Sequence, residues 1–184
     1  MIVILGTSAS GKTTVANELM NIYKLKKITT TTTRPPRENE TDGIDYNFIT
    51  IKEFMILKAR KHFAEIGNYR GWLYGTPAKD CTDDKVLVVT PSGLRQLKNR
   101  TDLNITSFYI KVPRKDCLIK MLEREQEVDI DECCRRSLSD VGQFDGIENE
   151  VDYIIENNGY EKSALDIASI IGMIMKLKEE DDKK

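Results

Sequence analysis

Gly6-Thr7-Ser8-Ala9-Ser10-Gly11-Lys12-Thr13 is the most informative stretch of the chain, because it fits the pattern G-x-x-x-x-G-K-[ST]. Residues 1–5 before it form an unbroken apolar run, which is typical of a buried strand in a parallel sheet. After it, apolar residues recur at helical spacing, namely Val15, Ala16, Leu19, Ile22 and Tyr23. A strand, a glycine loop and a helix in this order predict a phosphate-binding loop; the alternative is an ordinary glycine-containing turn.

The chemistry of this loop suits the phosphates of a nucleoside triphosphate. Its glycines let the backbone curl so that N–H groups point at phosphate oxygens, and the following helix brings its positive N-terminal end to the same place. Lys12 reaches the outer phosphates, and the Thr13 hydroxyl can bind Mg²⁺. The predicted triphosphate site consists of Gly6, Thr7, Ser8, Ala9, Ser10, Gly11, Lys12, Thr13 and Thr14, with Thr13 as the metal ligand.

The composition is that of a globular protein with one core. The chain has 184 residues, of which 40% are hydrophobic and 32% charged, which is enough for one domain with a small inserted lobe. The net charge of -2 gives no overall basic surface for nucleic acid. No apolar stretch is long enough to cross a bilayer, and the first apolar run is too short for a signal peptide. We therefore expect a protein that binds neither nucleic acid nor a membrane.

The cysteines argue against a zinc site. Cys81, Cys117, Cys133 and Cys134 form no C-x-x-C pair, and the chain has one histidine, His62. Reduced thiols are usual in the cytoplasm, so we expect a cytoplasmic protein. His62 is predicted to lie in a helix, in a structural or exposed position.

Predicted strands and helices alternate along much of the chain, which predicts an α/β fold with a parallel sheet between helices on both faces. Apolar or β-branched runs predict strands over residues 1–5, 29–33, 45–49, 85–90, 105–112 and 151–155. Helices are predicted over residues 13–23, 51–64, 91–99, 116–143 with a break near 128–131, and 160–177. Residues 67–77, rich in aromatic residues and glycine, indicate a small sheet with tight turns. Residues 34–79 break the alternation, so we expect an inserted lobe there, and residues 179–184 are predicted to be a disordered tail.

A second group of polar residues lies in the expected lobe. Arg34 and Arg37 follow a predicted strand, and guanidinium groups match phosphate oxygens in bidentate geometry. Tyr46 and Tyr74 offer phenol donors, and Glu40 could orient an arginine. The group suits a nucleoside monophosphate; the alternative is a solvated loop with ordinary surface ion pairs.

A longer pattern runs through this group. Thr32-Thr33-Arg34-Pro35-Pro36-Arg37-Glu38-Asn39-Glu40, followed by Gly43-Ile44-Asp45-Tyr46-Asn47-Phe48, resembles the guanylate kinase signature T-T-R-x-P-R-x-x-E and G-x-D-Y-x-F. Phe63-Ala64-Glu65 and Tyr74-Gly75-Thr76 resemble the next two blocks of that family, at matching separation. The resemblance is close over roughly the first half of the chain and loose over the rest, and a signature this long is far more specific than the loop alone.

The resemblance implies a P-loop kinase fold of three layers, with a parallel central sheet, a small mixed α/β lobe that binds a nucleoside monophosphate, and a helical lid. On this basis a single domain has its core in residues 1–33, 80–115 and 145–178, its lobe in residues 34–79 and its lid in residues 116–144. In the family, matching residues hold the phosphate of GMP and read its guanine. The implied GMP site consists of Arg34, Arg37, Tyr46 and Tyr74 for the phosphate, Thr30, Glu65 and Thr76 for the guanine, and Glu40 beside the arginines.

Glu65 has the chemistry that guanine requires. Guanine presents two donors side by side, N1–H and the exocyclic amine, and one carboxylate accepts both. Adenine has an acceptor at N1, which would face Glu65 with repulsion. Leaving such buried groups unpaired costs about 1–3 kcal/mol each, which is enough for discrimination between the two bases. The alternative is that Glu65 is a surface acid at the end of a helix.

The second half of the chain contains candidates for the lid. The family closes a basic lid over ATP, and Lys120, Arg124 and Arg136 stand near the matching positions, with Arg135 as an alternative to Arg136. These residues could also form one solvated helix face. Asn157 resembles part of the loop that contacts adenine in the family. The implied catalytic residues are Lys12, Arg34, Arg124 and Arg136.

The third core strand departs from the family pattern L-D-I-D-x-Q-G. This chain reads Leu87-Val88-Val89-Thr90-Pro91-Ser92-Gly93, so both acids are missing. One of them normally helps to order water around Mg²⁺ or contacts the acceptor nucleoside. Either Mg²⁺ relies here on Thr13, phosphates and water, or the acceptor differs from GMP. Ala9, where the family often has glycine, is a milder change.

The resemblance implies transfer of the γ-phosphoryl group of ATP to GMP and dGMP, with Mg²⁺ as cofactor. The attacking phosphate oxygen is largely ionised at neutral pH, so no general base is needed. Alternatives are a kinase for another (deoxy)nucleoside monophosphate such as dTMP, a non-catalytic guanylate-kinase-like binding module, and a regulatory nucleotide switch. The intact Gly11-Lys12-Thr13 argues against the binding module, and no second GTPase motif is visible. We expect either a monomer or a homodimer.

Overall fold

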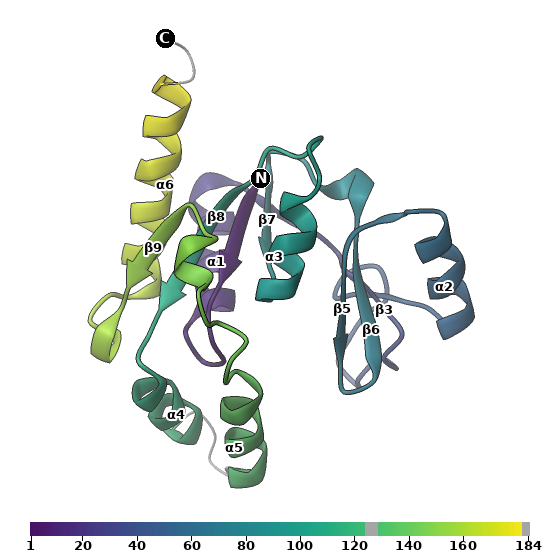
Figure 1. Cartoon of the computed structure of the whole chain (residues 1–184), viewed down its shortest axis with the longest axis horizontal. Helices are drawn as coiled ribbons and strands as arrows, with labels where there is room; N and C mark the ends of the chain where they lie inside the picture. Colours follow the sequence, from purple (N-terminus) through teal and green to yellow (C-terminus); the bar gives the residue numbers. More distant parts are fainter. Residues whose placement is uncertain (124–128, 182–184) are drawn as a thin grey trace.

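A five-stranded parallel sheet forms the centre of the molecule (Figure 1). The structure, a computed structural model, describes residues 1–123 and 129–181. The strand order is β2-β7-β1-β8-β9, and each neighbouring pair is parallel. These strands are β1 (Ile2–Leu5), β2 (Lys26–Lys27), β7 (Lys85–Val88), β8 (Thr106–Lys111) and β9 (Tyr153–Glu156). The predicted parallel central sheet is confirmed.

Helices cover both faces of this sheet, as predicted. The helices of the described residues are α1 (Lys12–Tyr23), α2 (Ile51–Ala59), α3 (Pro91–Lys98), α4 (Arg114–Glu123), α5 (Ile130–Ser139) and α6 (Ala164–Asp181). On one face, Leu19 of α1 and Ile171 of α6 belong to the same core cluster as Ile4. On the other face, Leu94 of α3 packs in a cluster with Val3. Ile4 and Val3 point to opposite faces because successive side chains alternate along a strand, and both are fully buried.

A smaller mixed sheet lies beside the central sheet, at the right of Figure 1. Its order is β4-β3-β6-β5, with β3 parallel to β4 and antiparallel to β6. Its strands are β3 (Thr31–Thr32), β4 (Asn47–Phe48), β5 (Phe63–Tyr69) and β6 (Trp72–Pro77). We call this four-stranded sheet the side sheet. Helix α2 packs on it through Phe54, whose ring stacks on Phe63 at a centroid distance of 4.6 Å.

The α4–α5 pair lies beyond the carboxyl ends of the central strands (Figure 1). Helix α4 follows β8, and α5 begins after Asp129, whose side chain accepts a hydrogen bond from the Glu132 N–H. Three short 3₁₀ turns complete the described structure: Ala78–Asp80, Ile147–Asn149 and Asn158–Tyr160. No helix among the described residues is both long and apolar enough to cross a membrane.

Three predicted elements are shorter than expected around the side sheet. The predicted strand over residues 29–33 is limited to β3, because the chain passes there from the central sheet to the side sheet. The predicted strand over residues 45–49 is limited to β4. The predicted helix over residues 51–64 ends at Ala59, where Lys61 takes a left-handed φ of 54° and turns the chain. Phe63 and Ala64 therefore belong to β5, and apolar spacing alone could not separate the two elements.

Other boundaries also differ from the prediction. His62 is not helical: it lies in the turn before β5, and its carbonyl accepts a 2.8 Å hydrogen bond from the Ala78 N–H. The predicted tail is wrong for residues 179–181, since α6 continues to Asp181 and leaves only 182–184 outside the described residues. Tyr160 precedes α6 in a 3₁₀ turn instead of starting the helix. The predicted break near 128–131 falls between α4 and α5, where residues 124–128 lie outside the described part.

Candidate active site at the phosphate loop

The glycines of the predicted phosphate loop stand where a side chain is excluded or unfavourable. The loop runs from the end of β1 to the start of α1. A Cβ atom on Gly6 would come within 2.3 Å of the Ser10 hydroxyl oxygen and 2.9 Å of the Ile110 carbonyl oxygen. Gly11 has a φ of 91°, the left-handed region that side chains disfavour, and it caps α1. Both glycines are therefore needed for the loop to close in front of the helix.

Ala9 adopts a conformation that suits glycine better. Its φ is 63°, which costs about 1–2 kcal/mol for a residue with a Cβ atom. The Tyr160 hydroxyl donates a 2.9 Å hydrogen bond to the Ala9 carbonyl oxygen and so helps to hold this part of the loop. Alanine at this position, where the family often has glycine, therefore introduces strain into the loop.

Lys12 points back into the loop. Its Nζ atom donates a 2.7 Å hydrogen bond to the Thr7 carbonyl oxygen. Burial lowers the pKa of Lys12 to about 8, although the negative charge of Asp140 acts in the opposite direction. The Ser10 hydroxyl is buried and has no hydrogen-bond partner among the described residues. The loop thus holds a desolvated ammonium group and an unsatisfied hydroxyl, both suited to anionic oxygens.

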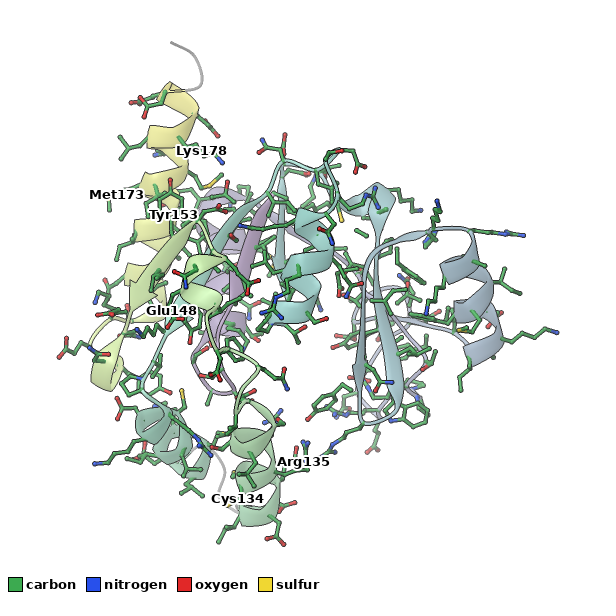
Figure 2. All side chains as sticks on the ribbon, viewed as in Figure 1. Cys134, Arg135, Glu148, Tyr153, Met173 and Lys178 are labelled. Atoms are coloured by element: carbon green, nitrogen blue, oxygen red, sulfur yellow. The ribbon has the colours of Figure 1, made fainter. Side chains whose placement is uncertain are left out.

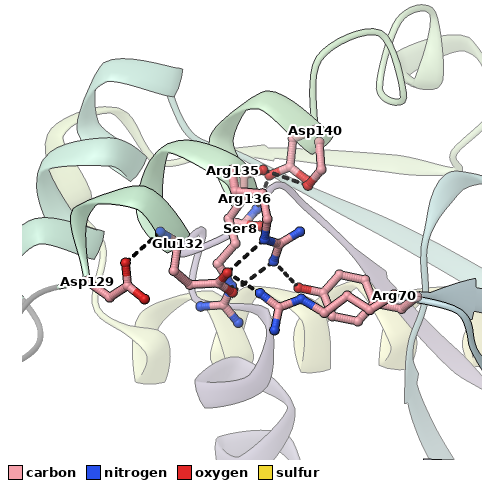
Figure 3. Close-up of polar contacts among 9 residues, drawn as sticks. Ser8, Arg70, Asp129, Glu132, Arg135, Arg136 and Asp140 are labelled. Atoms are coloured by element: carbon pink, nitrogen blue, oxygen red, sulfur yellow. Dashed lines mark hydrogen bonds and ion pairs between the residues drawn. The ribbon is translucent and has the colours of Figure 1, made fainter.

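A carboxylate from α5 reaches the same loop. Asp140, which caps the C-terminal end of α5, accepts a 2.6 Å hydrogen bond from the Ser8 backbone N–H (Figure 3). The α4 side contributes Cys117, whose sulfur lies 3.3 Å from the Thr7 hydroxyl oxygen. Between the loop and these helices lies a small cavity of about 70 Å³. The α4–α5 pair is therefore in direct contact with the phosphate loop.

The arginines of the predicted monophosphate site are held by Glu40. The Nη2 atom of Arg34 donates to both oxygens of the Glu40 carboxylate, at 2.7 and 2.8 Å. The Arg37 backbone N–H donates to the same carboxylate over 2.9 Å. The hydrogen bond from Arg34 holds the pKa of Glu40 below its usual value. Glu40 therefore orients Arg34, as the sequence indicated.

Aromatic rings complete this part of the site. The guanidinium carbon of Arg34 lies 5.4 Å from the ring centroid of Tyr46, within the range of a cation–π contact. Tyr46 meets Tyr74 edge to face at a centroid distance of 6.0 Å. The structure thus brings together Arg34, Glu40, Tyr46 and Tyr74, while the side chain of Arg37 is exposed at the edge of the group.

Glu65 is a buried acid on β5, so the alternative of a surface acid at a helix end is wrong. Its carboxylate accepts a 2.6 Å hydrogen bond from the hydroxyl of Thr76, which is fully buried on β6. Burial raises the pKa of Glu65, and the bond from Thr76 only partly opposes this. A Cβ atom on Gly93 would lie 3.1 Å from the Glu65 carboxylate, so the start of α3 closes one side of the site. Thr30 is half-buried just before β3, and its carbonyl oxygen accepts from the Asn47 N–H.

Gln96 fixes β5 to the core. Its side-chain amide accepts from the Ile66 N–H over 2.9 Å and donates to the Ile66 carbonyl oxygen over 2.8 Å. The side sheet is thereby attached to α3 next to Glu65. This residue was missed in the sequence, because an isolated glutamine on a helix carries no motif.

The predicted lid residues are placed unevenly. The Nε and Nη2 atoms of Arg135 donate hydrogen bonds of 2.7 and 2.8 Å to the Glu132 carboxylate. The Arg135 side chain extends from α5 toward the β5–β6 hairpin (Figure 2). Arg136 lies 3.4 Å from the same carboxylate. Lys120 lies over the ring of Tyr160 at 5.7 Å, away from this group. Arg124 lies outside the described residues.

Asn157 and Thr90 have structural contacts. The buried Asn157 side chain bonds the Lys162 backbone in both directions, at 2.8 and 3.0 Å, so it closes the turn between β9 and α6. Thr90, which replaces an acid of the family pattern, caps α3 by accepting from the Gly93 N–H over 3.2 Å. A further residue that sequence reasoning missed is Asp140. An acid at the C-terminal end of a helix opposes the helix dipole, and this is the signal that could have marked it.

Comparisons with known proteins agree with this geometry. The guanylate kinase family model matches residues 1–173. The guanylate kinase of Nitrosomonas europaea is 30% identical over 178 residues, which cover 93% of this chain and 88% of that protein. The guanylate kinase of Rickettsia bellii is 29% identical, with 93% and 92% covered. The crystal structure of guanylate kinase from Anaplasma phagocytophilum has the same fold, with a TM-score of 0.66, 23% identity, and coverage of 97% of this chain and 85% of that one.

A phosphate loop after the first strand of a parallel sheet, with a second polar site in a smaller sheet beside it, defines a nucleoside monophosphate kinase of the phosphate-loop class. Such an enzyme is a transferase of nucleotide metabolism. The chain belongs to the guanylate kinase family, which phosphorylates GMP to GDP with ATP.

Proposed function

We propose that this chain transfers the γ-phosphoryl group of ATP to GMP and to dGMP, with Mg²⁺ bound beside the phosphate loop. The single observation that carries the choice of acceptor is the buried Glu65, paired with Thr76. A buried carboxylate with a free accepting oxygen matches the two adjacent donors of guanine and opposes the N1 acceptor of adenine. In this proposal Thr30 donates to the guanine O6.

The phosphate of the acceptor is assigned to Arg34, Arg37, Tyr46 and Tyr74. Glu40 holds Arg34 in a fixed orientation, which supports a role in meeting phosphate oxygens with little loss of side-chain entropy. We assign the ATP phosphates to the loop residues, with Lys12, Arg34, Arg136 and Arg124 as the catalytic cations. Arg135, the alternative to Arg136, is included among the lid cations, because its guanidinium group bonds Tyr69 of the side sheet. Asn157 is assigned to the ATP site as well, although its side-chain amide bonds the Lys162 backbone and its backbone N–H bonds the Lys111 carbonyl oxygen.

The residues present fit Mg²⁺. This ion usually keeps several waters and binds through one or two protein oxygens together with phosphates. Thr13 offers one exposed hydroxyl in the first turn of α1, and no cluster of three acidic, histidine or cysteine side chains for a metal occurs in the described part of the chain. Thr13 is therefore assigned as the protein ligand. When bound, Mg²⁺ supplies positive charge to the phosphate oxygens of ATP.

Catalysis in this proposal consists of alignment and charge neutralisation. The attacking phosphate oxygen of GMP is already ionised at neutral pH, so the protein need not remove a proton. The low pKa of Lys12 belongs to the site without nucleotide, and neighbouring phosphates favour its charged form. We assign the side sheet with α2 to the acceptor lobe and the α4–α5 pair to the lid. Lobe and lid close over the reaction and exclude water.

Two further properties remain predictions. A cytoplasmic location agrees with the four cysteines, all of which are free. The chain is predicted to be a monomer or a homodimer.

The acceptor is tested by an ADP-release assay with GMP, dGMP, AMP, CMP and dTMP. The expected result is rapid turnover with GMP and dGMP. Turnover with AMP should be lower by at least about 100-fold, because adenine leaves the buried polar groups beside Glu65 unpaired. Glu65→Gln is the matched variant, since it keeps the shape and replaces one acceptor by a donor; it should lose preference for guanine. Turnover with GMP that is absent, or equal to that with AMP, would contradict the proposal. High turnover with another monophosphate would favour the alternative, a kinase for a different (deoxy)nucleoside monophosphate, which the missing acid at Thr90 suggests.

A further inference from the structure

The β5–β6 hairpin has a well-defined tip. Two residues, Arg70 and Gly71, connect the strands, with left-handed φ values of 56° and 80°. Two successive left-handed residues are the mark of a type I′ turn, which matches the twist of the strands on either side. The Asn68 side chain accepts a 3.1 Å hydrogen bond from the Gly71 N–H and closes the turn. The hairpin therefore presents Tyr69 and Arg70 at a fixed place at the end of the side sheet.

This tip touches α5. The Arg135 Nη2 atom donates a 2.6 Å hydrogen bond to the Tyr69 hydroxyl oxygen, and the Arg135 guanidinium lies 5.5 Å from the Tyr69 ring centroid. Arg70 forms an ion pair with Glu132, one turn before Arg135 on α5 (Figure 3). The residues of each pair lie more than 60 positions apart in the chain. These two contacts join the side sheet to helix α5.

The group carries surplus positive charge. Three guanidinium groups, those of Arg70, Arg135 and Arg136, surround the single carboxylate of Glu132. The hydrogen bond from Arg135 is the largest cause that lowers the pKa of Glu132, to about 2, so the carboxylate is ionised at neutral pH. Three positive charges against one negative charge leave about +2 for phosphate oxygens. Glu132 thus holds the arginines together without cancelling their charge.

We propose that Tyr69 and Arg70 are positioning residues that set the place of the lid arginine Arg135, so that closure of the acceptor lobe also places a cation for phosphoryl transfer. This inference rests on the proposed function, in which Arg135 belongs to the lid. Arg70 acts through Glu132, and Tyr69 acts on Arg135 directly. Neither residue touches the acceptor contacts of Glu65 or Arg34, so their effect falls on the rate of transfer and leaves binding of GMP unchanged.

Steady-state kinetics of the full chain tests this proposal. Tyr69→Phe removes only the hydroxyl, and Arg70→Ala removes the bridge to Glu132. Each is expected to lower kcat roughly tenfold, as for loss of one hydrogen bond to a charged group, with the KM values for GMP and ATP within about twofold. Arg70→Lys is expected to recover most of the rate, because it restores the charge beside Glu132. Arg60→Ala, an exposed arginine at the end of α2 in the same lobe, is the matched control and should keep the wild-type kcat.

A double-mutant cycle decides whether Arg70 acts through Glu132. If it does, Arg70→Ala lowers kcat in the wild-type background and has little further effect in the Glu132→Ala background. Equal effects in both backgrounds, or wild-type kcat in Tyr69→Phe and Arg70→Ala, would overturn the proposal. Absence of turnover with GMP in the unmodified chain would instead contradict the proposed function, so the two failures are distinguishable.

Discussion

The carboxylate of Asp140 accepts a 2.6 Å hydrogen bond from the backbone N–H of Ser8 and so occupies a donor of the phosphate loop. Asp140 also acts on the charge of Lys12, since it opposes the fall in the pKa of that ammonium group. The Asp140 carboxylate is negatively charged like a phosphate oxygen, and it occupies a backbone N–H of the loop that could otherwise donate to phosphate. An incoming triphosphate must therefore displace the Asp140 side chain before the Ser8 N–H is available.

Removing this charge should strengthen ATP binding. Asp140→Asn is expected to lower the Kd for a non-hydrolysable ATP analogue by up to about tenfold, since the repulsion and the competing hydrogen bond to an ionised group are lost. Isothermal titration calorimetry measures the change. Asp131→Asn, an exposed acid in the first turn of the same helix, is the control and should leave Kd unchanged. Weaker binding by Asp140→Asn would mean that Asp140 assists the closed, ATP-bound form.

Lys12 and the acceptor site should be separable by mutation. Lys12→Ala is expected to lower kcat by at least about 1,000-fold, because the loop loses the cation that we propose stabilises the transferring phosphoryl group. GMP binding should change by less than about threefold, since none of the contacts assigned to GMP involves Lys12. Turnover assays and a GMP titration give the two numbers. If GMP binding disappeared together with turnover, the separation of donor and acceptor sites would be wrong.

Glu65 should make GMP binding sensitive to acid. Burial raises the pKa of this carboxyl, and the protonated form has lost one of the two acceptors that guanine requires. Affinity for GMP is therefore constant above the raised pKa and falls as the pH drops through it. The raised pKa also affects the stability of the nucleotide-free protein. The stabilisation from protonated Glu65 is complete below the pKa that this carboxyl has in the unfolded chain, and it is lost as the pH rises through the pKa that it has in the folded protein.

Titration of the protein with GMP between pH 4.5 and pH 8 checks this expectation. Above the raised pKa of Glu65, Glu65→Gln should bind GMP roughly 100-fold more weakly, because its amide presents a donor to guanine, and the difference should narrow as acid protonates Glu65. The variant also separates the Glu65 effect from ionisation of the GMP phosphate, which titrates in both proteins. An acid loss of affinity that persists unchanged in Glu65→Gln would assign it to the phosphate alone.

Ala9→Gly should stabilise the loop. The left-handed φ of 63° costs about 1–2 kcal/mol for alanine, while glycine adds about 0.4–1 kcal/mol of unfolded-state entropy, so a net gain of up to about 1.6 kcal/mol in the free energy of unfolding is expected. Chemical denaturation measures it. Ala16→Gly, in the regular part of α1, is the matched control and should destabilise the protein. A loss of stability in Ala9→Gly would show that the loop carries no strain at this position.

The sequence allowed the core of the fold to be predicted because local signals were strong there. Residues 1–5 and 86–89 are apolar runs typical of strands in a sheet buried on both faces, and the glycines of the loop have steric causes visible in the motif. Arg34 and Glu40 lie close in the chain, so their pairing could be inferred from spacing. In these regions local pattern and tertiary structure agree.

The rest depends on contacts between distant residues. The apolar spacing of 51–64 fits a helix throughout, and only pairing of Phe63 with Pro77 across the sheet ends it early. Thr90 reads as a missing acid, although the structure uses it as a helix cap. Tyr69, Glu132 and Asp140 match no motif, because their importance arises where the side sheet, α5 and the loop meet. Charged residues of this kind are indistinguishable from solvated ones until the fold is known.

The attachment of β5 by Gln96 has a mechanical consequence. Gln96 fixes the backbone of Ile66 to α3, β3 bonds the hairpin as far as Leu73, and the hairpin continues from there to its turn and its contact with α5. From Ile66 to Arg70 the strand covers roughly 13 Å, at about 3.3 Å per residue. Glu65, the acid that we propose for guanine, lies next to the attached end of this span, and the bond to Arg135 lies at its far end. Because one strand joins the two places, we expect binding of guanine beside Glu65 to influence the contact between Tyr69 and Arg135.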